Sequence, residues 1–340
     1  MKRWQIAALA AGVVAAVVSV TVPTAPASAS DDDPYTFAVI GDIPYGSTAI
    51  ATFPKAIAQI NADPAVQWVD HVGDIKNGST VCSDDYFQLI KSDFDQFQDP
   101  LVYTVGDNEW TDCHRANNGG YNPSERLAKI RQVFFPQPGR TLGQRSAPVQ
   151  SQAALGIPEN VRWHRANVGF AAADVVGSND SLAPWTGQTA PTPEQTVEVL
   201  SRTSATIQEM HDAFAEARHE HERAVVLLLQ ADMFDPTVPN PSFSDYYGFQ
   251  PIVAAIAREA ASYNGQVYLF NGDSHVFNVD DPLGAGSTWL SFYGISQPVP
   301  NLTRITVDGS SNANDYLRVT VTVNGRGPQV LSWTRVPFTP

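Results

Sequence analysis

The chain has 340 residues, of which 43% are hydrophobic, and its formal net charge is −14. A chain of this length can bury a large core, either as one big domain or as two small ones. The acidic charge repels polyanions, so we expect no nucleic-acid partner, whereas a small anionic substrate can still bind where metal ions reverse the local charge.

The first segment has the pattern of an export signal. Two basic residues are followed by an apolar run at 6–22 and then by the small residues 27–29, which a signal peptidase accepts. A transmembrane anchor is the alternative, since the run is nearly long enough to cross a bilayer. The prolines after the run favour cleavage. We therefore predict a signal peptide at 1–29, one mature domain at 30–340 and a secreted protein without a membrane segment.

Five apolar, β-branched runs each precede Gly-Asp or a close variant of it. Apolar runs of this length are typical of strands that are buried on both faces. The five predicted strands are Tyr35–Ile40, Trp68–Val72, Leu101–Val105, Ala224–Leu229 and Gln266–Phe270. Helical patterns lie between them, at Ala49–Asn61, Asp84–Phe97, Pro123–Phe135, Glu194–Glu222 and Gln250–Tyr263. This alternation predicts βαβ units, a largely parallel sheet and an α/β fold.

Two stretches interrupt the alternation. Residues 160–176 have the pattern of two strands with a turn near Ala166 and Asn167, and residues 287–338 are rich in β-formers. In the second stretch, strands are predicted at 301–307 and 316–323. These strands lie either at the edges of the first sheet or in a second sheet packed on it.

The chain has two cysteines, Cys82 and Cys113. An exported protein meets an oxidising compartment, so we predict a disulfide between them, with two free thiols as the alternative. The bridge would fix the loop around Cys113 to the segment that follows the second predicted strand.

An acidic residue follows each of the five predicted strands. These residues are Asp42, Asp74, Asp107, Asp232 and Asp273. Ligands of open α/β sheets bind beyond the carboxyl ends of the strands. Converging carboxylates repel one another and ionise together only when a cation neutralises them. One Gly-Asp turn can equally cap a helix, but three in succession, followed by Gly-Asp-Ser-His, indicate a divalent-metal site.

The motifs resemble those of the calcineurin-like metallophosphoesterase superfamily. The resemblance covers residues 37 to about 280 and rests on Gly41-Asp42, Gly73-Asp74, Gly106-Asp107-Asn108-Glu109 and Gly272-Asp273-Ser274-His275, in that order. It implies a two-sheet β-sandwich flanked by helices, which is a four-layer αββα arrangement. It also implies two metal ions that are held by one bridging carboxylate.

The resemblance assigns ligands position by position. It implies that Asp42 and His275 bind one ion, that Asp74 bridges both ions and that Asn108 binds the other. Gln230 and Asp273 stand where the family has histidines. We expect Asp107 and Asp232 to support ligands without binding metal themselves. An oxygen-rich donor set of this kind favours Mn²⁺, Mg²⁺ or Ca²⁺ over Zn²⁺ or Fe.

The implied activity is hydrolysis of a small anionic phosphoester by a metal-activated water. Glu109 or His114 would donate a proton to the leaving group, and Asn108 and Arg115 would bind the phosphate. Alternatively, His114 and Arg115 belong to a solvated loop in which they pair with Asp112. The sequence leaves monoesters and diesters equally open and gives no prediction of oligomeric state.

Two other functions remain open from the sequence. Histidines of the family pattern are replaced, for example by Pro44 and Glu109, so a non-catalytic extracellular module that binds a metal or another ligand is the alternative. A hydrolase of another ester class is a third possibility. Two bound ions would favour hydrolysis, and one or none would favour binding.

Overall fold

The computed structural model describes Met1 and residues 35–339. The predicted signal peptide and its cleavage site fall within residues 2–34, outside that range. No helix in the described part of the chain is long and apolar enough to cross a membrane.

The described residues form two mixed β-sheets. The first has the order β12-β11-β1-β2-β3, and the second has the order β4-β5-β6-β7-β8-β10-β9. The first sheet consists of β1 (Tyr35–Ile40), β2 (Val69–His71), β3 (Leu101–Tyr103), β11 (Asp315–Val321) and β12 (Leu331–Pro337). The second consists of β4 (Gln150–Gln152), β5 (Ile157–Arg165), β6 (Val168–Ala172), β7 (Ala224–Leu228), β8 (Gln266–Asn271), β9 (Asn278–Asp280) and β10 (Leu302–Thr306).

Parallel strands make up the centre of each sheet. Strands β1, β2 and β3 run parallel in the first sheet, as do β6, β7, β8 and β10 in the second. Antiparallel strands are added outside these centres. Of the two arrangements left open by the sequence, the second sheet is the one present, because the strands outside the βαβ units pair antiparallel and complete two sheets. The two-sheet sandwich is confirmed.

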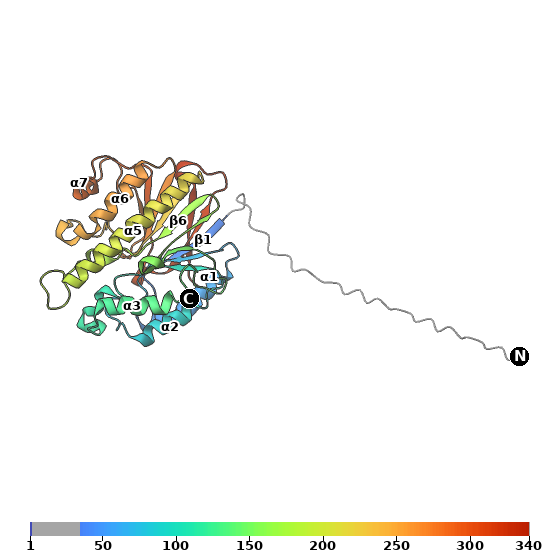
Figure 1. Ribbon diagram of the computed structural model, residues 1–340, viewed down its shortest axis with the longest axis horizontal. Helices are drawn as coiled ribbons and strands as arrows, with labels where there is room; N and C mark the ends of the chain where they lie inside the picture. The colour runs from blue at the N-terminus through green and yellow to red at the C-terminus, as the bar shows by residue number, and fades with distance from the viewer. Residues whose placement is uncertain (2–34, 340) are drawn as a thin grey trace.

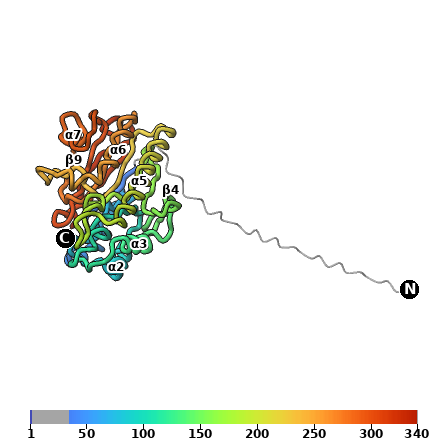
Figure 2. Tube along the Cα trace, turned by 60° about the vertical axis from the view of Figure 1, so that its left-hand side comes forward, coloured from blue at the N-terminus to red at the C-terminus, as the bar shows by residue number. Residues whose placement is uncertain are grey.

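Helices cover the outer face of each sheet, which gives four layers (Figure 1). Near the first sheet lie α1 (Gly46–Ala62), α2 (Asp84–Phe94) and α3 (Pro123–Phe134). Near the second lie α5 (Pro193–His219), α6 (Gln250–Ala261) and the short α7 (Thr288–Tyr293). Figure 2 shows α6 and α7 on the opposite side of the molecule from α2 and α3. A short left-handed segment, α4 (Gly177–Asp180), follows β6.

Three apolar cores join these layers, because the central strands are apolar on both faces. In β7, Val225 and Leu227 pack toward α5 and α6, whereas Val226 and Leu228 pack between the two sheets. Alternate side chains of a strand point to opposite faces, so an uninterrupted apolar run suits a strand covered on both sides. This packing fixes the carboxyl ends of the parallel strands.

Local sequence signals explain where the helices begin. The Asn122 side chain accepts a hydrogen bond from the Glu125 N–H, and Pro123 is the first residue of α3. Thr192 and Gln195 form a reciprocal capping box at the start of α5. Such caps satisfy N–H groups that have no partner within the helix.

Candidate metal centre

The turns that follow β1, β2, β3 and β8 bring four aspartates together. The N–H of Asp42 donates to Gly73 O at 3.0 Å, which joins the turns after β1 and β2. The N–H of Asp273 lies 3.1 Å from both carboxylate oxygens of Asp42, which joins the two sheets. Residues from distant parts of the chain therefore meet where the carboxyl ends of the parallel strands converge.

Two adjacent groups of side chains in the described structure have the spacing of metal ligands. One comprises Asp42, Asp74 and His275, and the other comprises Asp74, Asp107 and Asp273. Within each group, one ligand atom of every residue lies within 4.8 Å of the others. Asp74 belongs to both groups, which is the place of the bridging carboxylate implied by the resemblance. Asp107 is a direct member as well, although the sequence analysis gave it only a supporting role.

The electrostatics of this cluster favour a cation. Burial raises the pKa of Asp74, and the charges of Asp107 and Glu109 raise it further. Burial also raises the pKa of Asp273, with the charges of Asp107 and Asp42 adding to the effect. Ionised carboxylates at such close range repel one another unless a positive charge lies between them. The donor set of four carboxylates and one imidazole therefore fits divalent ions.

The backbone at these positions adopts a conformation that non-glycine residues rarely use. The φ angles are 53° at Asp42, 57° at Asp74, 71° at Asp273 and 61° at His275. Left-handed backbone costs roughly 1–2 kcal/mol for each such residue. Strain of this kind persists where the surrounding structure enforces it, and it is concentrated at functional sites.

Glycines make room for the carboxylates. A Cβ atom at Gly106 would collide with the carboxylate of Asp74, and one at Gly272 would collide with that of Asp42. The Cβ position of Gly177 lies 2.5 Å from Asp107 Oδ2. Each glycine is therefore required by a close approach between backbone and carboxylate.

The two amides predicted as ligands lie at the centre and donate hydrogen bonds to its carboxylates. Asn108 Nδ2 lies 2.6 Å from Asp74 Oδ2, and the Asn108 N–H donates to Asp74 Oδ1 at 3.1 Å. Tyr45 OH also donates to Asp74 Oδ2, at 2.8 Å. Gln230 Nε2 lies 3.4 Å from Asp107 Oδ1, while Gln230 Oε1 accepts from the Gly177 N–H. In this arrangement both amides orient aspartates, and their roles as metal ligands remain predictions.

Glu109 accepts hydrogen bonds from the turns around the centre. Its side chain is fully buried, and Oε1 accepts from the N–H groups of Gly106 and Asp74 and from Tyr103 OH. Burial raises the pKa of Glu109 to about 7. The predicted role of Glu109 as a proton donor to the leaving group stays a prediction. Glu109 holds the turns that carry Asp74 and Asp107, because its carboxylate accepts the N–H groups that these turns expose.

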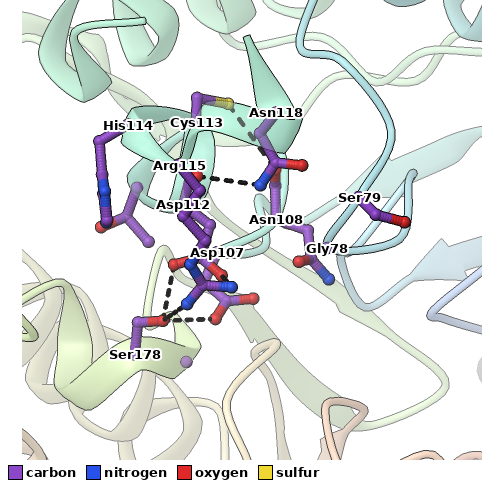
Figure 3. A network of polar contacts seen from close by, with 12 residues as sticks. Gly78, Ser79, Asp107, Asn108, Asp112, Cys113, His114, Arg115, Asn118 and Ser178 are labelled. Carbon is purple, nitrogen blue, oxygen red and sulfur yellow. Dashed lines mark hydrogen bonds and ion pairs between the residues drawn. The ribbon is translucent and has the colours of Figure 1, made fainter. Parts of the chain in front are cut away.

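His114 is turned toward a different loop (Figure 3). Its Nδ1 accepts from the N–H of Thr186 at 2.9 Å, and burial lowers the pKa of the half-buried ring. His114 Nδ1 also lies 2.8 Å from Thr186 Oγ1, so both contacts join the imidazole to Thr186. The role of His114 as a proton donor to the leaving group stays a prediction.

Arg115 pairs with Asp112, as in the alternative considered from the sequence. Arg115 Nη1 lies 2.7 Å from Asp112 Oδ2, and the arginine side chain keeps 42% of its surface exposed. Arg115 also lies near Gly78 and Ser178 (Figure 3). The pairing anchors the guanidinium beside the carboxylate cluster while leaving part of it open to solvent.

Lys76 is a site residue that the sequence analysis missed. It is fully buried, and its Nζ donates to the Asn108 carbonyl at 2.7 Å. Burial lowers the pKa of Lys76, and the charges of Glu109 and Asp74 act in the opposite direction. Its position two residues after Asp74, directly after the buried Ile75, was the available signal.

The predicted disulfide is present. Cys82 and Cys113 are bonded, with Cα atoms 5.9 Å apart, and both are fully buried. Their sulfurs lie 3.6 and 3.7 Å from the Asn108 carbonyl oxygen. The bridge therefore packs against the turn that carries Asp107 and Asn108.

No family model matches the chain, and no curated protein matches its sequence. Three solved structures illustrate what it is similar to. One is a Plasmodium protein described as the anchor in the inner membrane complex, with 9% identity, 90% of each chain covered and a TM-score of 0.39. Another is a 5'-nucleotidase precursor from Thermus thermophilus, with 10% identity, 91% of this chain and 55% of that chain covered, and a TM-score of 0.46. The third is a purple acid phosphatase from yellow lupin (Lupinus luteus) seeds, with 10% identity, 90% of this chain and 54% of that chain covered, and a TM-score of 0.42. The chain thus spans about half the length of the last two proteins.

Proposed function

We propose that this chain is a secreted, metal-dependent phosphoesterase of the calcineurin-like metallophosphoesterase superfamily. The observation that carries the proposal is the position of Asp74, which belongs to two adjacent groups of candidate ligands. Adjacent cation sites are what a two-metal hydrolytic mechanism needs. The sequence pattern of an export signal and the buried disulfide support secretion, because disulfides persist in oxidising compartments.

Each of the two groups of candidate ligands would hold one ion. Asp42 and His275 would hold one ion, Asp107 and Asp273 the other, and Asp74 both. Bound ions would supply Lewis acidity and positive charge for the phosphoryl group and its attacking water. The predominance of oxygen donors favours Mn²⁺, Mg²⁺ or Ca²⁺ over Zn²⁺ or Fe.

The surrounding residues bind substrate and hold the carboxylates in place. Arg115 is partly exposed and is anchored by Asp112, so its remaining N–H groups can bind phosphate oxygens. Tyr45 and Asn108 donate hydrogen bonds to Asp74 and fix its orientation. The expected substrate is a small anionic phosphoester.

Activity after metal removal and replacement tests the proposal. The mature protein is treated with chelator, and Mn²⁺, Mg²⁺, Ca²⁺ and Zn²⁺ are returned singly while hydrolysis of phosphate monoesters and diesters is measured. We expect turnover with Mn²⁺, Mg²⁺ or Ca²⁺ and its loss in Asp74→Asn. Asp245→Asn is the control, because it removes an exposed carboxylate from the loop after β7 and should leave turnover unchanged.

Absence of turnover with every ion and both substrate classes, in a protein shown to be folded, would contradict the proposal. The non-catalytic binding module would then be the better account of the acidic centre.

A further inference from the structure

Four consecutive non-glycine residues beside the metal centre have left-handed backbone. The φ angles are 51° at Ser178, 59° at Asn179, 53° at Asp180 and 68° at Ser181. Left-handed residues normally occur singly, and a run of them requires a structure that holds each one. We call residues 178–181 the left-handed turn.

Neighbouring elements hold every residue of the left-handed turn. Asp180 is fully buried, and Arg202 of α5 donates to both its carboxylate and its carbonyl oxygen. The Asn179 side chain accepts from the Gly248 N–H at 2.8 Å. Ser181 Oγ lies 2.7 Å from Thr111 Oγ1, in the loop after β3. The turn is thus fixed by α5, by the loop after β7 and by the loop after β3.

The remaining member, Ser178, contacts the carboxylates of two different parts of the site (Figure 3). Its Oγ lies 3.0 Å from Asp107 Oδ2 and 2.8 Å from Asp112 Oδ1. Asp107 belongs to the second group of candidate ligands, and Asp112 anchors Arg115. Arg115 Nη2 also lies 3.5 Å from Ser178 Oγ. The hydroxyl has one proton and donates to one of these carboxylates at a time, and it lies between the candidate metal ligand Asp107 and the carboxylate that pairs with Arg115.

We propose that Ser178 is a positioning residue. It would orient Asp107 toward the ion that Asp107 and Asp273 hold, and it would keep the Asp112–Arg115 pair directed toward the phosphate. The inference rests on the proposed function and adds the residue that links its two binding groups. The left-handed backbone matters because it presents the hydroxyl to both carboxylates while α5 and the two loops prevent the turn from relaxing.

The test uses three variants of the mature protein. Ser178→Ala removes the hydroxyl and keeps the strained backbone, whereas Ser178→Gly removes the hydroxyl and also relieves the strain, so it folds even if the alanine variant does not. Ser181→Ala is the matched control, because it removes a hydroxyl from the same turn that contacts Thr111 and neither Asp107 nor Asp112.

Calorimetric titration with Mn²⁺ and then with inorganic phosphate gives the readout. Removing an outer hydrogen-bond partner of a metal ligand typically lowers metal affinity by about 10- to 100-fold. We expect a decrease of that size at one of two Mn²⁺ sites in both Ser178 variants, together with weaker phosphate binding, and wild-type behaviour in Ser181→Ala.

Wild-type Mn²⁺ and phosphate affinities in both Ser178 variants would overturn the inference and leave the proposed function intact. Equal losses in Ser181→Ala would also overturn it, because the effect would then belong to the whole turn. Failure of the wild-type protein to bind Mn²⁺, Mg²⁺ or Ca²⁺ would overturn the proposed function and this inference together.

Discussion

At the scale of single residues, the site depends on buried acceptors as much as on ligands. Glu109 Oε1 accepts three hydrogen bonds, from the N–H groups of Gly106 and Asp74 and from Tyr103 OH, while Glu109 Oε2 has no partner among the described residues. A buried donor that loses its acceptor costs about 1–3 kcal/mol. The residue therefore contributes through the geometry of the turns that carry Asp74 and Asp107.

Two substitutions of Glu109 separate positioning from acid catalysis. Glu109→Gln keeps an oxygen acceptor for the three donors, so we expect turnover close to that of the wild type. Glu109→Ala leaves the donors unpaired, and we expect its free energy of unfolding to fall by about 3 kcal/mol or more in denaturant titrations. Loss of turnover in a stable Glu109→Gln protein would instead make Glu109 the proton donor.

At the scale of the elements, an imidazole joins β5 to the end of α5. His164 Nδ1 lies 2.7 Å from Glu222 Oε1, and His164 Nε2 lies 3.0 Å from Glu216 Oε2. The hydrogen bond to Glu222 raises the pKa of His164 to about 9, and the one to Glu216 adds to the effect. The ion pairs thus fasten an outer strand of the second sheet to its covering helix.

The raised pKa predicts how this contact depends on pH. Because the folded protein holds the His164 proton more tightly than the unfolded chain does, the stabilisation is complete below about pH 6.5 and is lost as the pH rises toward about 9. We expect His164→Gln to flatten the decline in unfolding free energy across this window, as measured by denaturant titration at several pH values. An unchanged slope would show that the imidazole does not carry this part of the pH dependence.

Element positions were predictable from the sequence wherever hydrophobic pattern and caps agreed. The strand Tyr35–Ile40 and the start of α3 at Pro123 match their predictions. The turn at Ala166 and Asn167 also lies between two strands as expected. Periodicity alone did not assign the strands to two sheets, because a strand covered on both faces has the same apolar run whichever sheet it joins.

The composition of the site was only partly predictable. Gly-Asp turns located Asp42, Asp74 and Asp273, because a residue that follows a parallel strand must lie at one edge of its sheet. The sequence did not predict that Asp107 is a candidate metal ligand or that Lys76 is buried. Both features depend on side-chain directions in irregular turns. The left-handed turn was not predictable from the sequence, because contacts with α5 and two loops hold its non-glycine residues in that conformation.

At the scale of the whole molecule, the acidic centre joins the two halves of the sandwich. Asp42 and Asp74 follow strands of the first sheet, whereas Asp273 and His275 follow a strand of the second. Cations held between them would link the sheets at this edge and offset the repulsion among the buried carboxylates. Metal binding should therefore stabilise the entire fold, because a ligand that binds only the native state raises its stability.

The most direct test is the number of divalent ions bound per chain, measured by calorimetric titration of the metal-free mature protein with Mn²⁺ and by elemental analysis after dialysis. We expect two ions per chain in the wild type, a raised melting temperature on binding, and loss of both ions in Asp74→Asn. Binding of one ion or none by a folded wild-type protein, or two ions retained by Asp74→Asn, would contradict the role of Asp74 as a ligand of both ions.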